Sequence, residues 1–570
     1  MADPLTVTSE QINSLPLLLG IIEDMEIRAI IDSIVPRHGH WQGASVGTLV
    51  SLWLCHILSE REHRLVAVRD WVADRTQTIQ ALLDIELRDT DCTDDRLATV
   101  LTRLGEPTTQ AALDAALVQR WLRVYALPVE TIRLDSTSVS VYHHSTDPDS
   151  LLQRGHSKDH RPDLCQFKTM LATLDPLGMP LTVQPVAGQR ADDGLYVPGY
   201  EAAVATVGTR AILVVGDSKM GALATRGHLA AHQSGYLCAY RPPNGARELA
   251  GWVDQALGRP DQWQAVETVD ARTGEVRRTA AIDAWERPQT WQDPATQTWH
   301  TWRERVLVVR SAAFQASQCR QREAALARLT VALMALGQPP RPGRKHVRQQ
   351  ADLAAHVAGL LDQAGLTGVA EVTVAEEPLP DGSTRWVVAA IAVNRAAWQA
   401  LVERLGWAVY LTTTTARQLD GPAVVATYHQ QPVHERGFSR LKTETLHIRP
   451  VYLRDEQRIC GLVWLLCLAL RVLTLTEHRV RTALAERQEA VVGLNPASRT
   501  QPTTRPTTER IVAAFANLTL TTLVLAGRVV RHVTPLTATQ RHLLVLLKLP
   551  ADLYERLEQA VPNSVLVLRE

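Results

Sequence analysis

The chain has 570 residues, more than one hydrophobic core can organise, so we expect three or four domains. Its apolar fraction of 45% and charged fraction of 21% are typical of an ordinary soluble globular protein. The 60 Lys and Arg residues balance the 60 Asp and Glu residues, and a net charge of zero counts against a general binder of polyanions.

Cysteine usage and apolar runs give a first indication of the compartment. Seven cysteines are scattered and none forms a CxxC pair, so no disulfide framework or zinc site is predicted, and a reducing cytoplasm fits. The first ten residues lack a basic stretch followed by an apolar one, so we expect no secretory signal. The apolar run from Ile459 to Leu470 stops at Arg471, short of the roughly 20 residues that a bilayer requires. We therefore expect a buried helix and no membrane contact.

Positive charge is nevertheless unevenly placed. Between Arg471 and His532 there are nine arginines against four acids, and residues 341–348 form a second basic stretch. Contact with phosphate needs such local basic surface, whatever the total charge. A solvated basic face without a partner explains each patch, taken alone, equally well.

The first part of the chain is predicted to be helical up to about residue 127. Val46 to Leu58 is almost continuously apolar, and Thr109 to Tyr125 has helical spacing without a turn signal. Asp94 or Asp95 follows an acidic break and could cap the next helix.

After Glu130 the pattern changes to strands. The β-branched segment 131–141 is predicted to be a strand, and 166–174 and 181–186 are two more, joined by a turn with Pro and Gly. Asp192 or Asp193 then opens a helix, and 210–215 is an apolar strand of the kind buried on both faces. These elements indicate an α/β fold: a mixed sheet with helices on its faces.

The rest of the chain is predicted to contain an inserted domain, the second part of the core and a C-terminal region. Short alternating segments rich in Trp predict a partly β inserted domain, after which 407–415 resumes strand character and 453–480 reads as a long core helix. Residues 493–509 are rich in Pro and Thr and read as a linker. The predicted parts are a helical N-terminal region (1–127), a core in two pieces (128–240 and 405–492), the insertion (241–404) and a small helical C-terminal region (493–570).

Two aspartates and a glutamate are the candidate metal ligands. Asp135 is an isolated acid on a strand, and Asp217 directly follows a buried strand, at the edge where open α/β sheets place their ligands. A turn or edge position is the alternative for Asp135, and helix capping is the alternative for Asp217. Glu435 lies far downstream. Carboxylates gathered from distant parts of a chain can hold Mg²⁺, which prefers oxygen ligands.

Further polar residues suit phosphate contact. If the chain is helical after Pro432, Glu435 and Lys442 are seven residues apart and project from one face, and Tyr428 lies one step earlier on the same stripe. A solvated helix face is the alternative. Lys158 and Arg161 belong to a dense polar loop that could contact substrate DNA, and an ordinary surface loop explains them equally well.

These residues resemble the DDE transposases of bacterial insertion sequences, in particular the IS4-like group and its IS1634-type branch. The late-helix signature of that group is Y-x2-R-x3-E-x6-K, which Tyr428, Glu435 and Lys442 match, while Gln431 replaces the arginine. Residues 155–164 resemble a further segment of the IS1634-type proteins, and 215–221 resemble their second-aspartate segment. The resemblance implies an RNase H-like core with acids on its first strand, its fourth strand and a late helix.

The resemblance also implies a chemistry. Asp135, Asp217 and Glu435 would hold two Mg²⁺ ions, for which Mn²⁺ may substitute, and Tyr428, Gln431 and Lys442 would lie near DNA phosphates. The enzyme would cleave the transposon ends and transfer the strand into target DNA. Its partners would be the terminal inverted repeats, target DNA and a second copy of the chain, in the bacterial cytoplasm at the nucleoid. A catalytically inactive DNA-binding descendant and a nuclease that cleaves without joining remain alternatives.

Overall fold

The computed structural model describes residues 6–37, 39–241, 246–269, 276–337, 347–380, 382–495, 498, 500–525 and 528–559. The chain folds into two compact units. The first comprises Met1–Tyr236, Gln292–His300 and Tyr428–Glu570, and the second comprises Leu237–Trp291 and Thr301–Thr427. The domain boundaries drawn from the sequence stay a prediction.

Helices dominate the beginning of the first unit. The apolar stretch predicted there forms α3, whose N-cap Ser45 side chain accepts a hydrogen bond from the backbone N–H of Thr48. Its interior is buried on every side, which explains the absence of an alternating pattern. The helices are α1 (Leu15–Asp24), α2 (Ile27–Ile34), α3 (Val46–Glu60), α4 (Leu65–Ala73), α5 (Thr76–Leu83), α6 (Asp94–Leu104) and α7 (Pro107–Val124).

A mixed sheet forms the centre of the first unit, as predicted. The strand order is β4-β3-β2-β5-β6. The first three strands pair antiparallel, whereas β5 runs parallel to β2. The order therefore matches an RNase H-like core, with β2 as the first strand and β5 as the fourth. The strands are β2 (Thr131–Val141), β3 (Cys165–Leu174), β4 (Met179–Ala187), β5 (Leu213–Gly216) and β6 (Gly235–Ala239).

Helices cover this sheet. Asp193–Leu195 is one 3₁₀ turn that leads into α8 (Tyr196–Val207), and α9 (Leu223–Ala231) follows β5. Strand β5 begins three residues later than predicted, and the Arg210 side chain before it forms an ion pair with Glu201 on α8.

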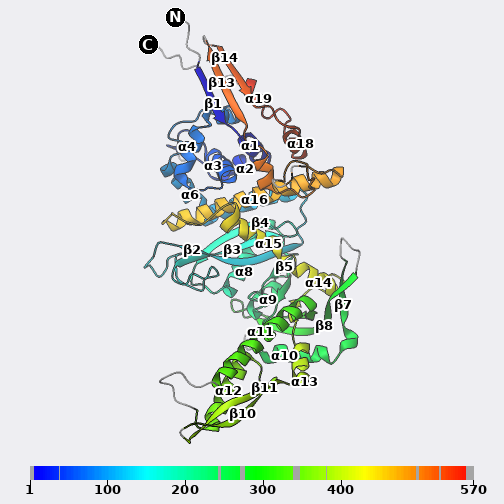
Figure 1. The fold of residues 1–570 in the computed structure, drawn as a ribbon. Helices are drawn as coiled ribbons and strands as arrows, with labels where there is room; N and C mark the ends of the chain where they lie inside the picture. The colour runs from blue at the N-terminus through cyan, green and yellow to red at the C-terminus, as the bar shows by residue number, and fades with distance from the viewer. Residues whose placement is uncertain are drawn as a thin grey trace. The chain divides into compact units, whose positions relative to one another are not determined.

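The long core helix predicted near residue 460 is α16 (Glu456–Arg487), which lies across β4 in Figure 1. By length and composition it could cross a membrane, yet 94% of its most apolar window is buried inside the protein. The expected end of the apolar run, Arg471, is not at a surface: its side chain is fully buried in the middle of the helix.

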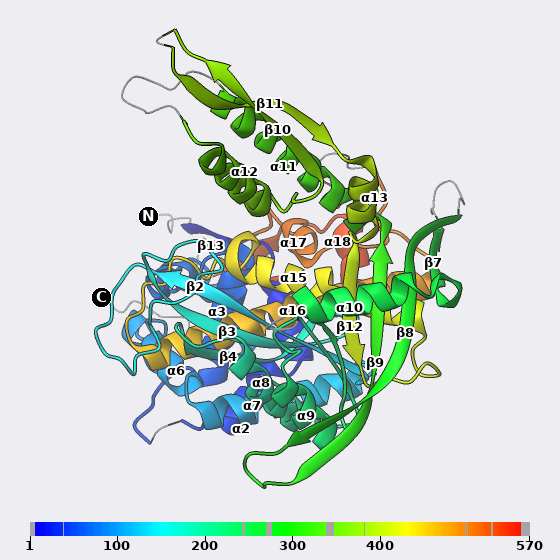
Figure 2. The same cartoon turned by 90° about the horizontal axis from the view of Figure 1, so that it is seen from below.

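The second unit continues the chain from the end of β6. Its strands follow the order β6-β12-β9-β8-β7, and α10 lies against them (Figure 2). Trp252 of α10 packs on Trp285 of β8. The elements are α10 (Ala246–Leu257), a 3₁₀ turn (Pro260–Gln262), β7 (Gln264–Val269), β8 (Val276–Gln292), β9 (Trp299–Ser311) and β12 (Trp407–Thr412).

A smaller cluster within the second unit has its own hydrophobic core. Leu329 and Leu333 of α11 pack there with Leu353 of α12 and with the hairpin β10–β11. The basic stretch predicted at 341–348 lies mostly outside the described residues. The elements of this cluster are α11 (Ala312–Gly337), α12 (Gln350–Ala364), β10 (Ala370–Pro378), β11 (Thr384–Val393) and α13 (Arg395–Glu403). Outside it, α14 (Gly421–Tyr428) follows β12, and its Gly421 lies against β7 and β8.

The two ends of the chain meet in a three-stranded sheet that the sequence analysis did not predict. Its order is β1-β13-β14, and β1 pairs antiparallel with β13 across more than 500 residues, Thr6 opposite Val524. The elements are β1 (Thr6–Gln11), α17 (Thr508–Ala513), β13 (Thr519–Leu525), β14 (Arg528–Val533), α18 (Ala538–Leu546) and α19 (Arg556–Gln559).

Candidate active site

Strand pairing brings the two predicted aspartates together. In the parallel pair of β2 and β5, Leu134 lies opposite Gly216, so Asp135 and Asp217 are the next residues on neighbouring strands. Both line one small cavity of about 20 Å³, room for roughly a single water. This placement favours a site shared by the two aspartates over the alternatives, a turn position for Asp135 and a helix cap for Asp217.

The surroundings of Asp135 disfavour its negative charge. Burial, with a smaller effect of the nearby carboxylates of Asp217 and Asp192, raises the pKa of Asp135 to about 6, against the opposing effects of Lys158 and the Ser136 N–H. The Ser136 N–H lies 2.7 Å from Asp135 Oδ1. The neighbouring carboxylates repel one another, and a cation bound between them would offset this repulsion.

Asp217 is held in place by two donors. The Tyr196 hydroxyl donates to Asp217 Oδ1 over 2.6 Å, and the backbone N–H of Lys219 donates to the same oxygen over 2.7 Å. Burial, followed by the two aspartates, raises the pKa of Tyr196 well above its usual value. The phenol therefore stays protonated and orients Asp217, leaving Oδ2 for another ligand.

Lys158 lies among the carboxylates. Its ammonium donates to the Ser136 carbonyl over 2.6 Å and lies 3.8 Å from Asp135 Oδ1 and 3.5 Å from Asp192 Oδ2. Asp192 also binds the ammonium of the buried Lys168 over 2.6 Å. Lys158 was predicted to contact DNA; in this structure its charge is directed at the acids of the site.

Arg161, the other loop residue predicted to contact DNA, lies on the surface. Its guanidinium forms two hydrogen bonds to Asp163, of 2.9 and 2.7 Å, and both side chains are exposed. The contact of Arg161 with DNA stays a prediction.

The chain is helical after Pro432, as predicted, and carries Glu435 and Lys442, but Tyr428 lies on a separate helix and does not continue their stripe. Tyr428 ends α14, two turn residues follow, and a new helix, α15, runs from Gln431 to Ser439 before a π-helical segment, Arg440–Glu444. The proline at the second position of α15 suits a helix start, because its missing N–H would be unpaired there anyway.

Tyr428 nevertheless reaches the aspartates by another route. Its backbone carbonyl accepts a hydrogen bond from the Arg133 guanidinium over 3.2 Å, and Tyr428 lines the same small cavity as Asp135 and Asp217. Arg133 is buried on β2 and bonded to Asp175 over 2.7 Å, so the strand that carries Asp135 also anchors the end of α14.

Glu435 is exposed on α15 and is not gathered with the aspartates. Asp135, Asp217 and Glu435 do not form a group of ligand atoms within 4.8 Å of one another. The residue before it, His434, lines the cavity instead. Glu435 as the third metal ligand stays a prediction.

His434 is the buried residue that fixes α15 to the sheet. Its Nδ1 is 2.7 Å from the Thr173 hydroxyl on β3, and its Nε2 is buried without a partner in the described part of the chain. Burial, with a smaller effect of Arg133, lowers the pKa of His434 to about 3, so the imidazole is neutral. An orphaned nitrogen beside a water-sized cavity suits one ordered water.

Lys442 is engaged by the polar loop. Its ammonium lies 2.9 Å from Asp159 Oδ1, and Arg449 lies 3.1 Å from the other oxygen of the same carboxylate. Burial lowers the pKa of Lys442, opposed by Asp159. The side chain of Gln431 lies outside the described residues. Phosphate contacts of both residues stay predictions.

Some residues of the site had weak sequence signals. A lysine inside an apolar strand, as Lys168 is, should indicate a buried partner, which proves to be Asp192. Tyr196 carried no signal, because its role depends on α8 lying under the β5 strand end.

A separate cluster has the composition of a transition-metal site. The ligand atoms of Glu201, His228 and His232 lie within 4.8 Å of one another, and His228 Nε2 is 2.7 Å from Glu201. Arg210 already balances the negative charge of this cluster, because its hydrogen bond to Glu201 lowers the pKa of that carboxyl to about 2.

The donor set at Asp135 and Asp217 fits a divalent cation. Carboxylate oxygens are the ligands that Mg²⁺ prefers, and the pKa of Asp135, raised chiefly by burial and also by Asp217, belongs to a carboxylate whose charge a bound cation would stabilise. The side-chain hydrogen bond of Asp217 occupies one oxygen and leaves the other.

Two stretches of the chain match known protein families. The model of the family described as transposase DDE domain matches residues 130–472, and that of a domain of unknown function (DUF4277) matches residues 7–115. No curated protein matches the chain. A cryo-EM structure of a piggyBac transposase synaptic complex with hairpin DNA aligns with a TM-score of 0.29 and 10% identity, covering 83% of this chain and 76% of that chain.

Proposed function

Because the chain belongs to the transposase DDE domain family, whose model matches residues 130–472, we propose that it cleaves transposon ends and joins them to target DNA by metal-dependent phosphoryl transfer. The chain is thus an enzyme of the transposase class. The observation that carries the proposal is the side-by-side placement of Asp135 and Asp217 on neighbouring parallel strands. We further propose the IS4-like group, its IS1634-type branch, and a bacterial cytoplasmic location.

Each residue has a role in this proposal. Asp135 and Asp217 would hold Mg²⁺ together, and Glu435 would complete the set. Two bound divalent cations would supply Lewis-acid activation of the attacking oxygen and stabilise the leaving one. Tyr196 orients Asp217, while Lys158 balances Asp135 and Asp192.

DNA would reach the site from the side of α15. Tyr428 lines the cavity, and Lys442 and Arg449 share Asp159 close to the loop that carries Lys158. A phosphate that displaced Asp159 from these cations would gain two charge-assisted contacts. Terminal inverted repeats and target DNA are the proposed partners, with a homodimer as the assembly that pairs two ends.

A plasmid that carries the DNA flanking the gene tests the proposal. With Mg²⁺ or Mn²⁺, the wild-type protein should nick it, and both Asp217→Asn and Glu435→Gln should lower the rate about 100-fold or more. The Asp149→Asn variant, changed at an exposed turn, is the control and should nick at the wild-type rate. Nicking by Asp217→Asn at the wild-type rate would contradict the proposal.

The exposed position of Glu435 favours one alternative, a DNA-binding protein that has lost catalysis. Such a protein would bind the flanking DNA and never nick it with either metal. A nuclease that does not join would nick without yielding a joined product, which gel analysis of a target plasmid detects.

A further inference from the structure

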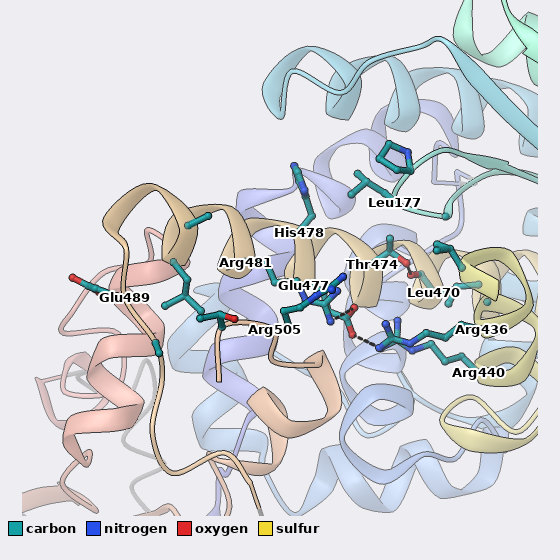
Figure 3. Close-up of a pocket in the computed structure, with 18 of the residues that line it drawn as sticks. Leu177, Arg436, Arg440, Leu470, Thr474, Glu477, His478, Arg481, Glu489 and Arg505 are labelled. Atoms are coloured by element: carbon teal, nitrogen blue, oxygen red, sulfur yellow. Dashed lines mark hydrogen bonds and ion pairs between the residues drawn. The ribbon is translucent and has the colours of Figure 1, made fainter. Parts of the chain in front are cut away.

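A large pocket lies on the first unit, between α15, α16 and the chain near residue 505 (Figure 3). Its volume is about 940 Å³. One wall is apolar and is formed by the turn Pro176-Leu177-Gly178, together with Leu470 of α16. The other wall carries charged side chains from three segments that are distant in the sequence.

Arginines dominate that charged wall. Arg436, Arg440 and Arg481 all converge on one carboxylate, that of Glu477 (Figure 3). Arg436 Nη2 lies 2.9 Å from Glu477 Oε1, and Arg481 Nη2 lies 3.0 Å from Oε2. Three guanidinium groups therefore share a single negative charge that is itself buried.

The remaining acids do not restore the balance. Glu509 lies behind the pocket, where it pairs with the buried Arg440 over 2.9 Å. Glu489, at the far end of the pocket, is 2.9 Å from His542 Nε2. Neither carboxylate is described in contact with Arg436 or Arg481, so those two guanidiniums keep a net positive charge between them.

A fourth arginine adds to the excess. Arg505 lines the pocket, is exposed, and has no ion pair in the described part of the chain. The pKa of Arg481 is lowered chiefly by burial and also by the charges of Arg436, Arg505 and Arg440. Guanidinium groups stay protonated in proteins, so this crowding appears as positive potential in the pocket.

We propose that this pocket binds a phosphate of the DNA backbone through Arg436 and Arg505. Arg481 contributes its charge, because its Nε and Nη2 already donate to the Pro506 carbonyl over 3.1 and 3.0 Å. The proposal rests on the proposed function and adds a second point of DNA contact to it. Guanidinium groups match phosphate in shape and donate two parallel hydrogen bonds to it. The apolar wall would face the sugars, which need no hydrogen-bond partners there.

The position of Arg436 on α15 links the pocket to the proposed catalytic site, which favours DNA as the anion. Arg436 directly follows Glu435, and consecutive helix residues are about 1.5 Å apart along the axis and roughly 100° apart around it. A strand held at Arg436 therefore passes the helix that carries the proposed third acid. The same helix face, through Val433, contacts Gly178 of the apolar wall.

Duplex binding without metal tests the proposal separately from catalysis. The affinity of wild-type and Arg505→Gln protein for a fluorescent duplex of the flanking DNA is measured by anisotropy in EDTA over a salt series. Loss of one phosphate contact should reduce the slope of log affinity against log salt by about 0.9. It should also weaken binding about tenfold at low salt. Arg436→Gln should have the same effect.

Arg510→Gln is the matched control, because Arg510 is an exposed arginine nearby that does not line the pocket. It should bind as the wild type does. Thermal melting confirms that all variants fold. Equal slopes for Arg505→Gln and Arg510→Gln would overturn the proposal. Inorganic phosphate could also raise the melting temperature of the wild type alone while duplex binding is the same in all variants. That result would indicate a pocket for free phosphate and would also overturn the proposal.

The outcomes separate the two proposals. If the wild type never nicks DNA but Arg505→Gln still lowers the salt slope, the catalytic proposal fails and the pocket stands. If nicking depends on Asp217 but the slopes are equal, the pocket fails and the catalytic proposal stands. An acidic peptide as occupant would likewise leave the duplex slopes equal.

Discussion

At the residue scale, the site is organised by a shortage of positive charge. Asp135, Asp217 and Asp192 approach one another, and Lys158 is the cation shared by two of them. Tyr196 and the Lys219 N–H satisfy one oxygen of Asp217, so its orientation does not depend on a metal ion. The metal-free protein thus keeps its ligands positioned, at a cost in stability that falls mainly on Asp135.

That cost predicts a pH-dependent effect of Asp135→Asn. The folded-state pKa is about 6, above the unfolded value of roughly 3.9, so the native state binds more protons between these values. The free energy of unfolding therefore falls as pH rises from about 4 to 6. In EDTA at pH 7.5, Asp135→Asn should be more stable than the wild type, because it removes a carboxylate whose charge the folded protein disfavours. We expect a difference of about 1–3 kcal/mol in the free energy of unfolding, a range that allows for the partial exposure of this carboxylate to solvent.

Urea unfolding at the two pH values checks this prediction. At pH 4 the advantage of Asp135→Asn should vanish, because the wild-type carboxyl is then protonated in the folded state. Added Mg²⁺ should stabilise the wild type and not the variant. A variant less stable than the wild type at pH 7.5 would contradict the charge-shortage account, and Asp149→Asn is the exposed control.

At the element scale, α16 is fixed to its surroundings by a buried ion pair. Arg471 donates to Asp114 of α7 over 2.7 Å and to the carbonyls of Pro180 and Leu181 on β4 over 3.0 and 2.6 Å. Trp464 donates to the same carboxylate over 2.8 Å. The helix thereby joins the N-terminal helices to the sheet, and it also forms one side of the arginine pocket.

Removing one partner of this pair should be costly. Arg471→Met leaves the Asp114 carboxylate buried and uncompensated, and we expect a loss of about 3–5 kcal/mol in the free energy of unfolding. The double variant Asp114→Leu/Arg471→Met removes both charges and should recover most of the loss. Urea unfolding of the three proteins measures this. A single variant as stable as the wild type would contradict the prediction.

At the scale of the whole molecule, the two ends of the chain depend on each other. Strand β1 pairs with β13, the Ile12 N–H donates to the Leu518 carbonyl over 3.0 Å, and the Tyr554 hydroxyl donates to the Asn13 carbonyl over 2.8 Å. Tyr554 also stacks on Phe515. The N-terminal helices and the C-terminal region therefore form one structure in the first unit.

Truncation tests this dependence. Deleting 518–570 removes the partners of β1, and we expect the melting temperature of the first unit to fall by at least about 5 °C. Limited proteolysis should then cut earlier within residues 6–83. Deleting only 560–570, which the structure does not describe, is the control and should change neither result. Equal melting of the two truncations would contradict the prediction.

Much of the catalytic core was predictable because it depends on local pattern. Apolar and β-branched runs predicted the strands β2, β3 and β5, and a long apolar run predicted α16. An acid within such a strand, as Asp135 is, or directly after one, as Asp217 is, is unusual in its place, which is why both could be selected from the sequence.

The sequence by itself thus determined the core strands β2, β3 and β5, the core helix α16, and the two aspartates that belong to those strands. Only the tertiary structure decided how side chains from separate segments meet. Lys158 and Tyr196 act on the aspartates, Glu435 stays in solvent, and Arg471 is buried rather than terminal. The reason is physical: periodicity reports which face of one element is apolar, whereas the pairing of charges and of β1 with β13 depends on contacts between residues hundreds of positions apart.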